Sequence, residues 1–169
     1  MKLREYHLED YEEVVDLFYN TVHSVNAEDY TEEQLDAWAP EDKSLPKLDS
    51  RLLNSYAVVA EKDGIIVGFG NAEDTGYFDC LYTHKDYQRI GVATLIADSI
   101  EKYLYGKGIQ IIAVDASVTA KPFFEKREYL VLQKESVERR GQTIAYFKMQ
   151  KNLMNEHHPV FEKSDTIQK

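Results

Sequence analysis

Apolar residues recur every three or four positions in parts of the chain, which is the spacing of helices with one buried face. This spacing predicts four helices. They run from Leu8 to Val25, from the capping box Thr31–Gln34 to Ala39, from Ile90 to a stop at Gly106 or Gly108, and over a short segment after Thr119 with Pro122 in its first turn. The segment 41–50 shows no such spacing and is predicted to be a loop.

Other stretches alternate between apolar and polar residues or are apolar throughout, which predicts strands. The predicted strands are Lys2–Tyr6, Tyr56–Ala60, Ile65–Phe69, Gly76–His84, Ile109–Ser117, Tyr129–Val137 and Gln142–Gln150. Turn residues at 62–64 and 138–141 join two pairs of these strands into hairpins. Because Ile109–Ser117 is an almost continuous apolar run, we expect that strand to be buried on both faces.

The order of these elements predicts an α/β fold with a mixed, mostly antiparallel central sheet of about seven strands and about four helices. A length of 169 residues suits one domain with a sizeable core. We therefore expect a single domain over residues 1–150. The last segment, 151–169, has little periodicity and is predicted to be a loose tail.

The net charge of −10 is unevenly distributed along the chain. Residues 1–42 contain 13 acidic and 2 basic residues, so that this segment alone carries −11. Such a balance argues against a nucleic-acid partner, which requires a basic face. It suits a cationic partner such as an amine, although a charged run of this kind is also typical of a solvated helix face.

Several features point to a protein of the reducing cytoplasm. No apolar stretch approaches the ~20 residues of a membrane helix, and the first residues lack the apolar core of a signal peptide. Cys80 is the single cysteine, which excludes an internal disulfide and predicts a small buried side chain. No histidine spacing indicates a metal site, and His157 and His158 fall in the predicted tail.

The stretch Asp86–Leu95, DYQRIGVATL, places a polar loop and one glycine directly before the most strongly patterned helix. A helix leaves its first four N–H groups unpaired, and its dipole adds roughly half a positive charge at that end. Phosphate groups bind well at such a position, and Gly91 would let them approach the backbone. From the spacing alone, a phosphate site and an ordinary helix start both fit.

Two motifs resemble those of the GCN5-related N-acetyltransferase (GNAT) superfamily. Gln88-Arg89-Ile90-Gly91-Val92-Ala93 is similar to its Gln/Arg-x-x-Gly-x-Gly/Ala motif, and the strand and turn of DCLYTHKDYQ precede it in the usual way. The segment VDASVTAKPFFEKREYLV is similar to a second motif of the family, and the order of elements matches up to about Met149. The stretch Thr21–Pro40 further resembles a bacterial subgroup, the YafP-like acetyltransferases.

The resemblance implies that acetyl-CoA is the cofactor and that it lies between the strands Tyr77–Thr83 and Ile109–Ala116. It implies that main-chain groups of Leu81, Tyr82 and Thr83 pair with the pantetheine arm, with Ser117 and Phe124 nearby. Following Gln88, the backbone that would hold the pyrophosphate comprises Arg89, Ile90, Gly91, Val92, Ala93 and Thr94. Family members are often monomers or homodimers.

Acetyl transfer to an amine requires a group that removes a proton, since an alkyl ammonium has a pKa near ~10.4. Asp79 is the leading candidate base, because in a regular strand it shares a face with Leu81 and Thr83, opposite Cys80. A structural or substrate-orienting carboxylate is the alternative for Asp79.

Many family members protonate the leaving thiolate with a tyrosine, at a position that Phe124 occupies here. Tyr129, Tyr82 and Ser117 are possible substitutes. Glu128 also replaces a glycine of the family pattern. The expected function is an N-acetyltransferase that acts on a small or peptidic amine, with no nucleic-acid or membrane partner. Because Phe124 has no proton to donate, an acyl-CoA-binding sensor or scaffold without catalysis is the alternative.

Overall fold

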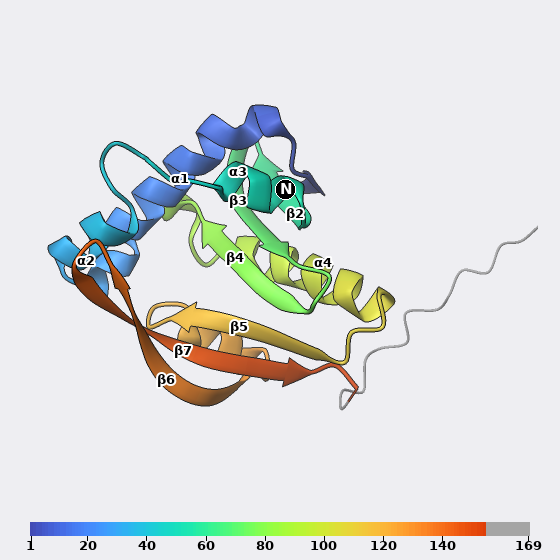
Figure 1. Ribbon diagram of the computed structural model, residues 1–169. Coiled ribbons are helices and arrows are strands. Elements are labelled where there is room, and N and C mark those ends of the chain that lie inside the picture. The colour runs from blue at the N-terminus through green and yellow to red at the C-terminus, as the bar shows by residue number, and fades with distance from the viewer. Residues whose placement is uncertain (155–169) are drawn as a thin grey trace, which may run out of the picture.

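A seven-stranded sheet with the order β1-β2-β3-β4-β5-β7-β6 forms the centre of the computed structural model, which describes residues 1–154 (Figure 1). The strands are β1 (Lys2–Glu5), β2 (Tyr56–Lys62), β3 (Ile65–Ala72), β4 (Tyr77–Thr83), β5 (Ile111–Ser117), β6 (Leu130–Arg139) and β7 (Gln142–Asn152). Only β4 and β5 pair in parallel, and every other pair is antiparallel. The predicted mixed, mostly antiparallel sheet is confirmed.

Helices cover both faces of the sheet (Figure 1). They are α1 (Tyr11–Ser24), α2 (Glu32–Trp38), α3 (Leu48–Leu53), α4 (Val92–Gly106) and α5 (Lys121–Lys126), with single 3-10 turns η1 (Leu8–Asp10), η2 (Asn26–Glu28) and η3 (Lys85–Tyr87). One apolar core lies beneath α1, α2 and α3, and a second lies beneath α4 and α5. No helix within residues 1–154 is long and apolar enough to cross a membrane.

The sequence analysis missed α3, which lies partly in the segment predicted to be a loop. This helix has six residues, too few to show a helical period, and it buries only Leu48 and Leu52. The predicted capping box of α2 is confirmed: the Thr31 hydroxyl accepts a hydrogen bond from the Gln34 N–H at 3.3 Å, and the Gln34 side chain accepts one from the Thr31 N–H at 2.9 Å.

Two glycines of β3 let α4 lie directly against the sheet. A Cβ at Gly68 would come within 2.5 Å of Val92, and one at Gly70 within 2.7 Å of Ile96. Both distances are well below van der Waals contact, so any larger residue would push the helix away. This close packing fixes where the N-terminus of α4 lies relative to β4.

The expectation that β5 is buried on both faces is wrong. Ile112, Val114 and Ala116 are buried in the core beneath α4 and α5, whereas Ile111 and Asp115 are exposed. The run is apolar on both sides, but helices cover only one face of this half of the sheet.

The predicted domain boundary at residue 150 falls inside β7, which continues to Asn152. Lys151 and Leu153 are buried, because they pack against α4 and the start of β5. The domain therefore extends beyond residue 150. The rest of the predicted tail, 155–169 with its two histidines, lies outside the described residues.

Candidate active site

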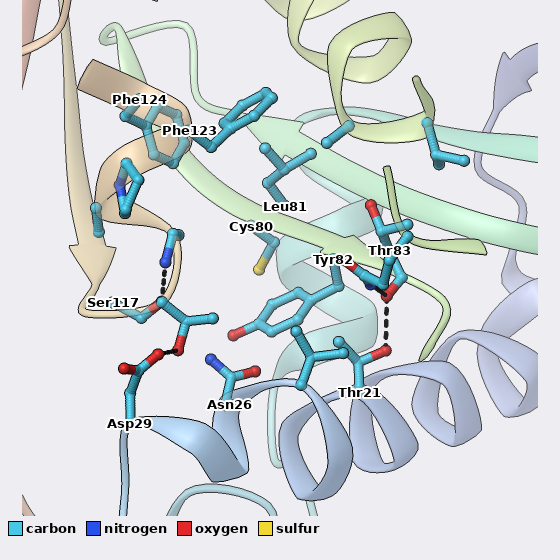
Figure 2. Close-up of a pocket in the computed structure, with 18 of the residues that line it drawn as sticks. Thr21, Asn26, Asp29, Cys80, Leu81, Tyr82, Thr83, Ser117, Phe123 and Phe124 are labelled. Atoms are coloured by element: carbon cyan, nitrogen blue, oxygen red, sulfur yellow. Dashed lines mark hydrogen bonds between the residues drawn. The ribbon is translucent and has the colours of Figure 1, made fainter. Parts of the chain in front are cut away.

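The strands β4 and β5 diverge and leave a cavity between them (Figure 2). They pair only at Tyr77 with Ala113 and Phe78 with Val114, and beyond this point the two strands separate. The cavity has a volume of about 750 Å³ and is lined by both strands, the N-terminus of α4, α5, η2 and the end of α1. It is therefore large enough for a small-molecule ligand.

The N-terminus of α4 opens onto this cavity with unpaired N–H groups. Gly91 precedes the helix at φ +91°, no side chain caps the helix, and the first hydrogen bond inside it joins the Leu95 N–H to the Gly91 carbonyl at 3.0 Å. The three preceding N–H groups therefore have no partner within the helix. Arg89, at φ +61°, and Lys85 add positive charge to the cavity wall. These donors and charges fit the pyrophosphate of a coenzyme.

Gln88 fixes the loop that leads into α4. Its side-chain amide donates to the carbonyl oxygens of Thr83 at 2.8 Å and His84 at 3.2 Å. The Thr83 carbonyl also accepts a hydrogen bond from the Thr21 hydroxyl at 2.9 Å, so it is already engaged. Gln88 therefore connects the end of β4 to the loop by hydrogen bonds.

The backbone of Leu81 remains open toward the cavity. The carbonyl oxygens of Cys80 and Tyr82 lie beside β3, next to Gly70 and Gly68. Because backbone groups alternate along a strand, those of Leu81 face the opposite edge, where β5 has separated from β4. An extended ligand could pair with this edge as an added strand would.

A β-bulge at Asp79 interrupts β4. In the pairing with β3, Cys80 and Phe78 oppose successive residues, so that Asp79 is extra. As a result Phe78 and Leu81 both belong to the core beneath α4, while Cys80 belongs to the core beneath α1. The expectation that Asp79 shares a face with Leu81 and Thr83, opposite Cys80, is wrong because the strand is not regular.

Asp79 is held by a guanidinium from α3. Arg51 donates to both carboxylate oxygens of Asp79, at 3.1 and 2.5 Å, and to the Cys80 sulfur at 3.6 Å. The Asn71 amide adds a third donor to Asp79 at 3.1 Å, and the Asp79 side chain is only 10% exposed. A bidentate pair of this kind fixes the position and orientation of the carboxylate.

Two predicted site residues lie away from the cavity lining. Tyr129 is buried behind Phe124, and its hydroxyl donates to Glu101 at 3.1 Å. It therefore does not reach the cavity as a proton donor. The Ile90 side chain is half exposed and does not line the cavity. The remaining predicted residues do line it: Asp79, Leu81, Tyr82, Thr83, Gln88, Arg89, Gly91, Val92, Ala93, Thr94, Ser117 and Phe124.

The proton-bearing side chains of the cavity floor keep their protons at neutral pH. Burial raises the pKa of Cys80 to about 12, and burial likewise raises the pKa of Tyr82. Ser117 accepts a hydrogen bond from the Ala120 N–H at 3.0 Å and so caps the turn before α5. Phe124 is packed among other aromatic rings and supplies only an apolar surface.

The same fold occurs in known acetyltransferases. A family model for an acetyltransferase (GNAT) domain matches residues 26–153. The chain belongs to the GNAT superfamily. It is 31% identical over 149 residues to the uncharacterized N-acetyltransferase YafP of Escherichia coli strain K12, covering 88% of this chain and 94% of that protein.

Solved GNAT structures resemble this GNAT domain closely. The crystal structure of a GCN5-related N-acetyltransferase from Rhodopseudomonas palustris is 35% identical, with a TM-score of 0.86, over 90% of this chain and 95% of that one. The PaiA N-acetyltransferase of Thermoplasma acidophilum, solved with coenzyme A, shares the fold at 20% identity and a TM-score of 0.71, over 89% of this chain and 98% of that one.

The sequence analysis missed two polar residues of this GNAT site, Arg51 and Asn26. Arg51 lies 28 residues before its partner Asp79, in the helix that was not predicted. Asn26 lines the cavity and is 5% exposed. It follows the buried Val22 by four positions, so a polar residue on the apolar stripe was the available signal.

Proposed function

We propose that the protein is an acetyl-CoA-dependent N-acetyltransferase that acts on a primary amine. The observation that carries this proposal is the cavity between β4 and β5, which begins at the unpaired N–H groups of α4 and ends at polar side chains beneath η2. Membership in the GNAT superfamily supports the same function. The reaction needs a place for a charged coenzyme at one end and an amine at the other, and this cavity offers both.

When bound, acetyl-CoA supplies an acetyl thioester. The amine nitrogen forms a bond to the acetyl carbon as the C–S bond breaks. The amine loses one proton, and the departing thiolate gains one. The backbone N–H groups after Gly91, with Arg89 and Lys85, would hold the pyrophosphate. The open main chain of Leu81 would hold the pantetheine arm. Ser117 and Phe124 complete the wall on the side of β5 and α5.

The acceptor end of the cavity favours a cation. Glu28, Asp29 and Asp115 line its mouth and are exposed, while the lining cations Lys85 and Arg89 belong to the α4 end. Long-range attraction by such carboxylates raises the local concentration of a cationic acceptor. A small-molecule or peptidic amine that is charged in solution therefore suits this site.

Asp79 remains a candidate base, and its pairing with Arg51 favours the orienting role. A carboxylate fixed by a guanidinium positions neighbouring groups well but has fewer lone pairs left to accept a proton. The thiolate, with a pKa near ~8.5 by analogy with cysteine, can take its proton from solvent.

An acyl-CoA-binding module without catalysis is the alternative function. Phe124 supports it, because the position that resembles the family's tyrosine here has no hydroxyl. Such a module would sense or carry an acyl-CoA without transferring its acyl group.

Two measurements separate these functions. Isothermal titration calorimetry with CoA tests the coenzyme site, and release of free thiol from acetyl-CoA in the presence of an amine panel tests transfer. We expect CoA binding and amine-dependent thiol release. CoA binding without turnover across the panel, together with no effect of Asp79→Ala, would favour the binding module instead.

A further inference from the structure

Asn26 presents an unpaired amide to the cavity. The residue is 5% exposed and lines the cavity, and no hydrogen bond to its side chain occurs among residues 1–154. Figure 2 shows the amide pointing from η2 into the space beside the Tyr82 hydroxyl. The amide atoms keep some accessible surface, because the fully enclosed side-chain atoms without a partner in the described residues are those of Tyr6 and Asn71. That surface opens into the cavity, where a ligand can form hydrogen bonds with the amide.

The groups around Asn26 on the cavity floor are neutral. Burial raises the pKa values of Tyr82 and Cys80, so both keep their protons, and Trp38 completes this part of the lining. The carboxylate of Asp79 forms a salt bridge with Arg51. An amine that enters this region meets hydrogen-bond acceptors but no unpaired negative charge.

A carboxylate, that of Asp29, follows Asn26 by one 3-10 turn. The Asp29 N–H donates to the Asn26 carbonyl at 3.0 Å, which closes a 3-10 turn. In such a turn the side chains at positions i and i+3 lie on the same face, about 6 Å apart along the axis. Asp29 is exposed at the cavity mouth, where the Thr119 hydroxyl donates to it at 2.8 Å. Asn26 and Asp29 therefore form a deep neutral site and a shallow anionic site in line.

We propose that this pair selects an acceptor with two amino groups joined by a short aliphatic spacer. The reacting amine donates to the side-chain amide oxygen of Asn26 and to the Tyr82 hydroxyl, and the second, still protonated amine binds Asp29. A short spacer suits the pair because the two residues are one 3-10 turn apart in the chain. This inference rests on the proposed function and identifies its substrate class as small diamines or polyamines.

The neutral amide at residue 26 suits the chemistry better than a carboxylate would. An anion within about 4–6 Å of an ammonium raises its pKa and so keeps the amine protonated and unreactive. The amide accepts a hydrogen bond from the amine without stabilising that charge to the same degree. The Asp29 carboxylate, in contrast, raises the pKa of the second amine. That amine therefore stays protonated and can pair with Asp29.

Other ionisable groups also face the acceptor and set the baseline for any pH measurement. Those that line the cavity are Glu28 from η2 and Asp29 directly after it, Asp79, Cys80 and Tyr82 from β4, Asp115 from β5, and Lys85 and Arg89 near α4. All of these ionisable residues are still present in an Asn26 variant. A change in the pH profile of that variant therefore reports on the group at residue 26.

The test compares 1,4-diaminobutane with 1-aminobutane as acceptors in the full-length protein. Wild type should prefer the diamine, and Asp29→Asn should lower its kcat/KM about tenfold while leaving the monoamine unchanged. Asn26→Ala should raise the KM of both amines about tenfold. Asn26→Asp, nearly the same in shape, should shift the pH profile of kcat upward by one unit or more. Asn20→Ala, exposed on α1, is the matched control.

Several outcomes would overturn this inference. A diamine preference that survives Asp29→Asn, or an Asn26→Asp variant with an unshifted pH profile, removes the assignment. A loss of CoA affinity in Asn26→Ala, measured by calorimetry, places Asn26 at the coenzyme instead. A preference for lysine peptides over the diamine names a different acceptor class.

Calorimetry of diamine binding to the CoA complex keeps this test separate from the proposed function. If wild type releases no thiol with any amine, the proposed function fails. Diamine binding that is weakened by Asn26→Ala still supports the acceptor site in that case, and binding that is unaffected contradicts it.

Discussion

Gly91→Glu should weaken coenzyme binding strongly while leaving the protein folded. Gly91 has φ +91°, and no atom lies within 4 Å of the position that a Cβ would take. Left-handed backbone strain should therefore cost about 1–2 kcal/mol of stability, a drop in Tm of about 2–8 °C. The larger effect comes from the carboxylate, which enters the space in front of the unpaired N–H groups of α4.

The loss of affinity follows from the repulsion between this carboxylate and a pyrophosphate. Two like charges about 4 Å apart repel by about 1 kcal/mol in bulk water and about 4 kcal/mol near a protein surface. A penalty of about 2 kcal/mol or more corresponds to at least a roughly 30-fold increase in the Kd of CoA. Isothermal titration calorimetry measures this Kd, and thermal unfolding shows whether the variant is folded.

Gly108→Glu is the matched control. Gly108 also has a positive φ, +79°, and open space around it, but it follows the other end of α4. Fifteen helical residues put it about 22 Å from Gly91, more than two Debye lengths at physiological salt. Wild-type affinity in Gly91→Glu, or an equal loss in Gly108→Glu, would refute the phosphate site.

Three further predictions concern groups around the cavity. Arg51→Ala should lower the free energy of unfolding in urea by about 2 kcal/mol, because Asp79 loses its guanidinium partner. This magnitude lies between those of exposed and of buried ion pairs. An unchanged urea midpoint of unfolding would contradict the prediction. Tyr30→Phe should cost about 1–3 kcal/mol in the same assay, since it leaves one N–H after β5 and one carbonyl of β7 unpaired; a smaller loss would mean that water replaces the hydroxyl. At pH 8, iodoacetamide should alkylate Cys80 about 1,000-fold more slowly than in the unfolded chain, because its pKa rises from 9.0 to about 12 and less thiolate is present; equal rates by mass spectrometry would disprove burial of the thiol.

Much of the fold could be predicted because its signals are local. The helix α4 shows four turns of apolar periodicity, and the hairpins carry turn residues such as Asp63 and Gly64 between their strands. The loop before α4 was also predicted, since Gly91 and the polar residues before it stand next to that strong pattern. A short helix such as α3 has no comparable signal, and its position depends on packing against β2.

The candidate site was predicted less completely because it depends on contacts between distant segments. The β-bulge at Asp79 reverses the alternation of β4, and nothing in the local sequence distinguishes it from a regular strand. The pairing of Asp79 with Arg51 joins two elements far apart in the chain. The sequence likewise did not show that the Tyr129 hydroxyl donates to Glu101 in the core, a contact between two segments far apart in the chain.

Detection of the acetylated amine distinguishes acetyl transfer from coenzyme binding alone. Wild-type protein, acetyl-CoA below its Kd and 1,4-diaminobutane should give mono-acetylated diamine by mass spectrometry at a rate that is proportional to protein concentration. Gly91→Glu should lower that rate at least about 30-fold, while Gly108→Glu should not. Absence of acetylated product with every amine tested, in a protein that still binds CoA, would contradict the account and leave a coenzyme-binding module.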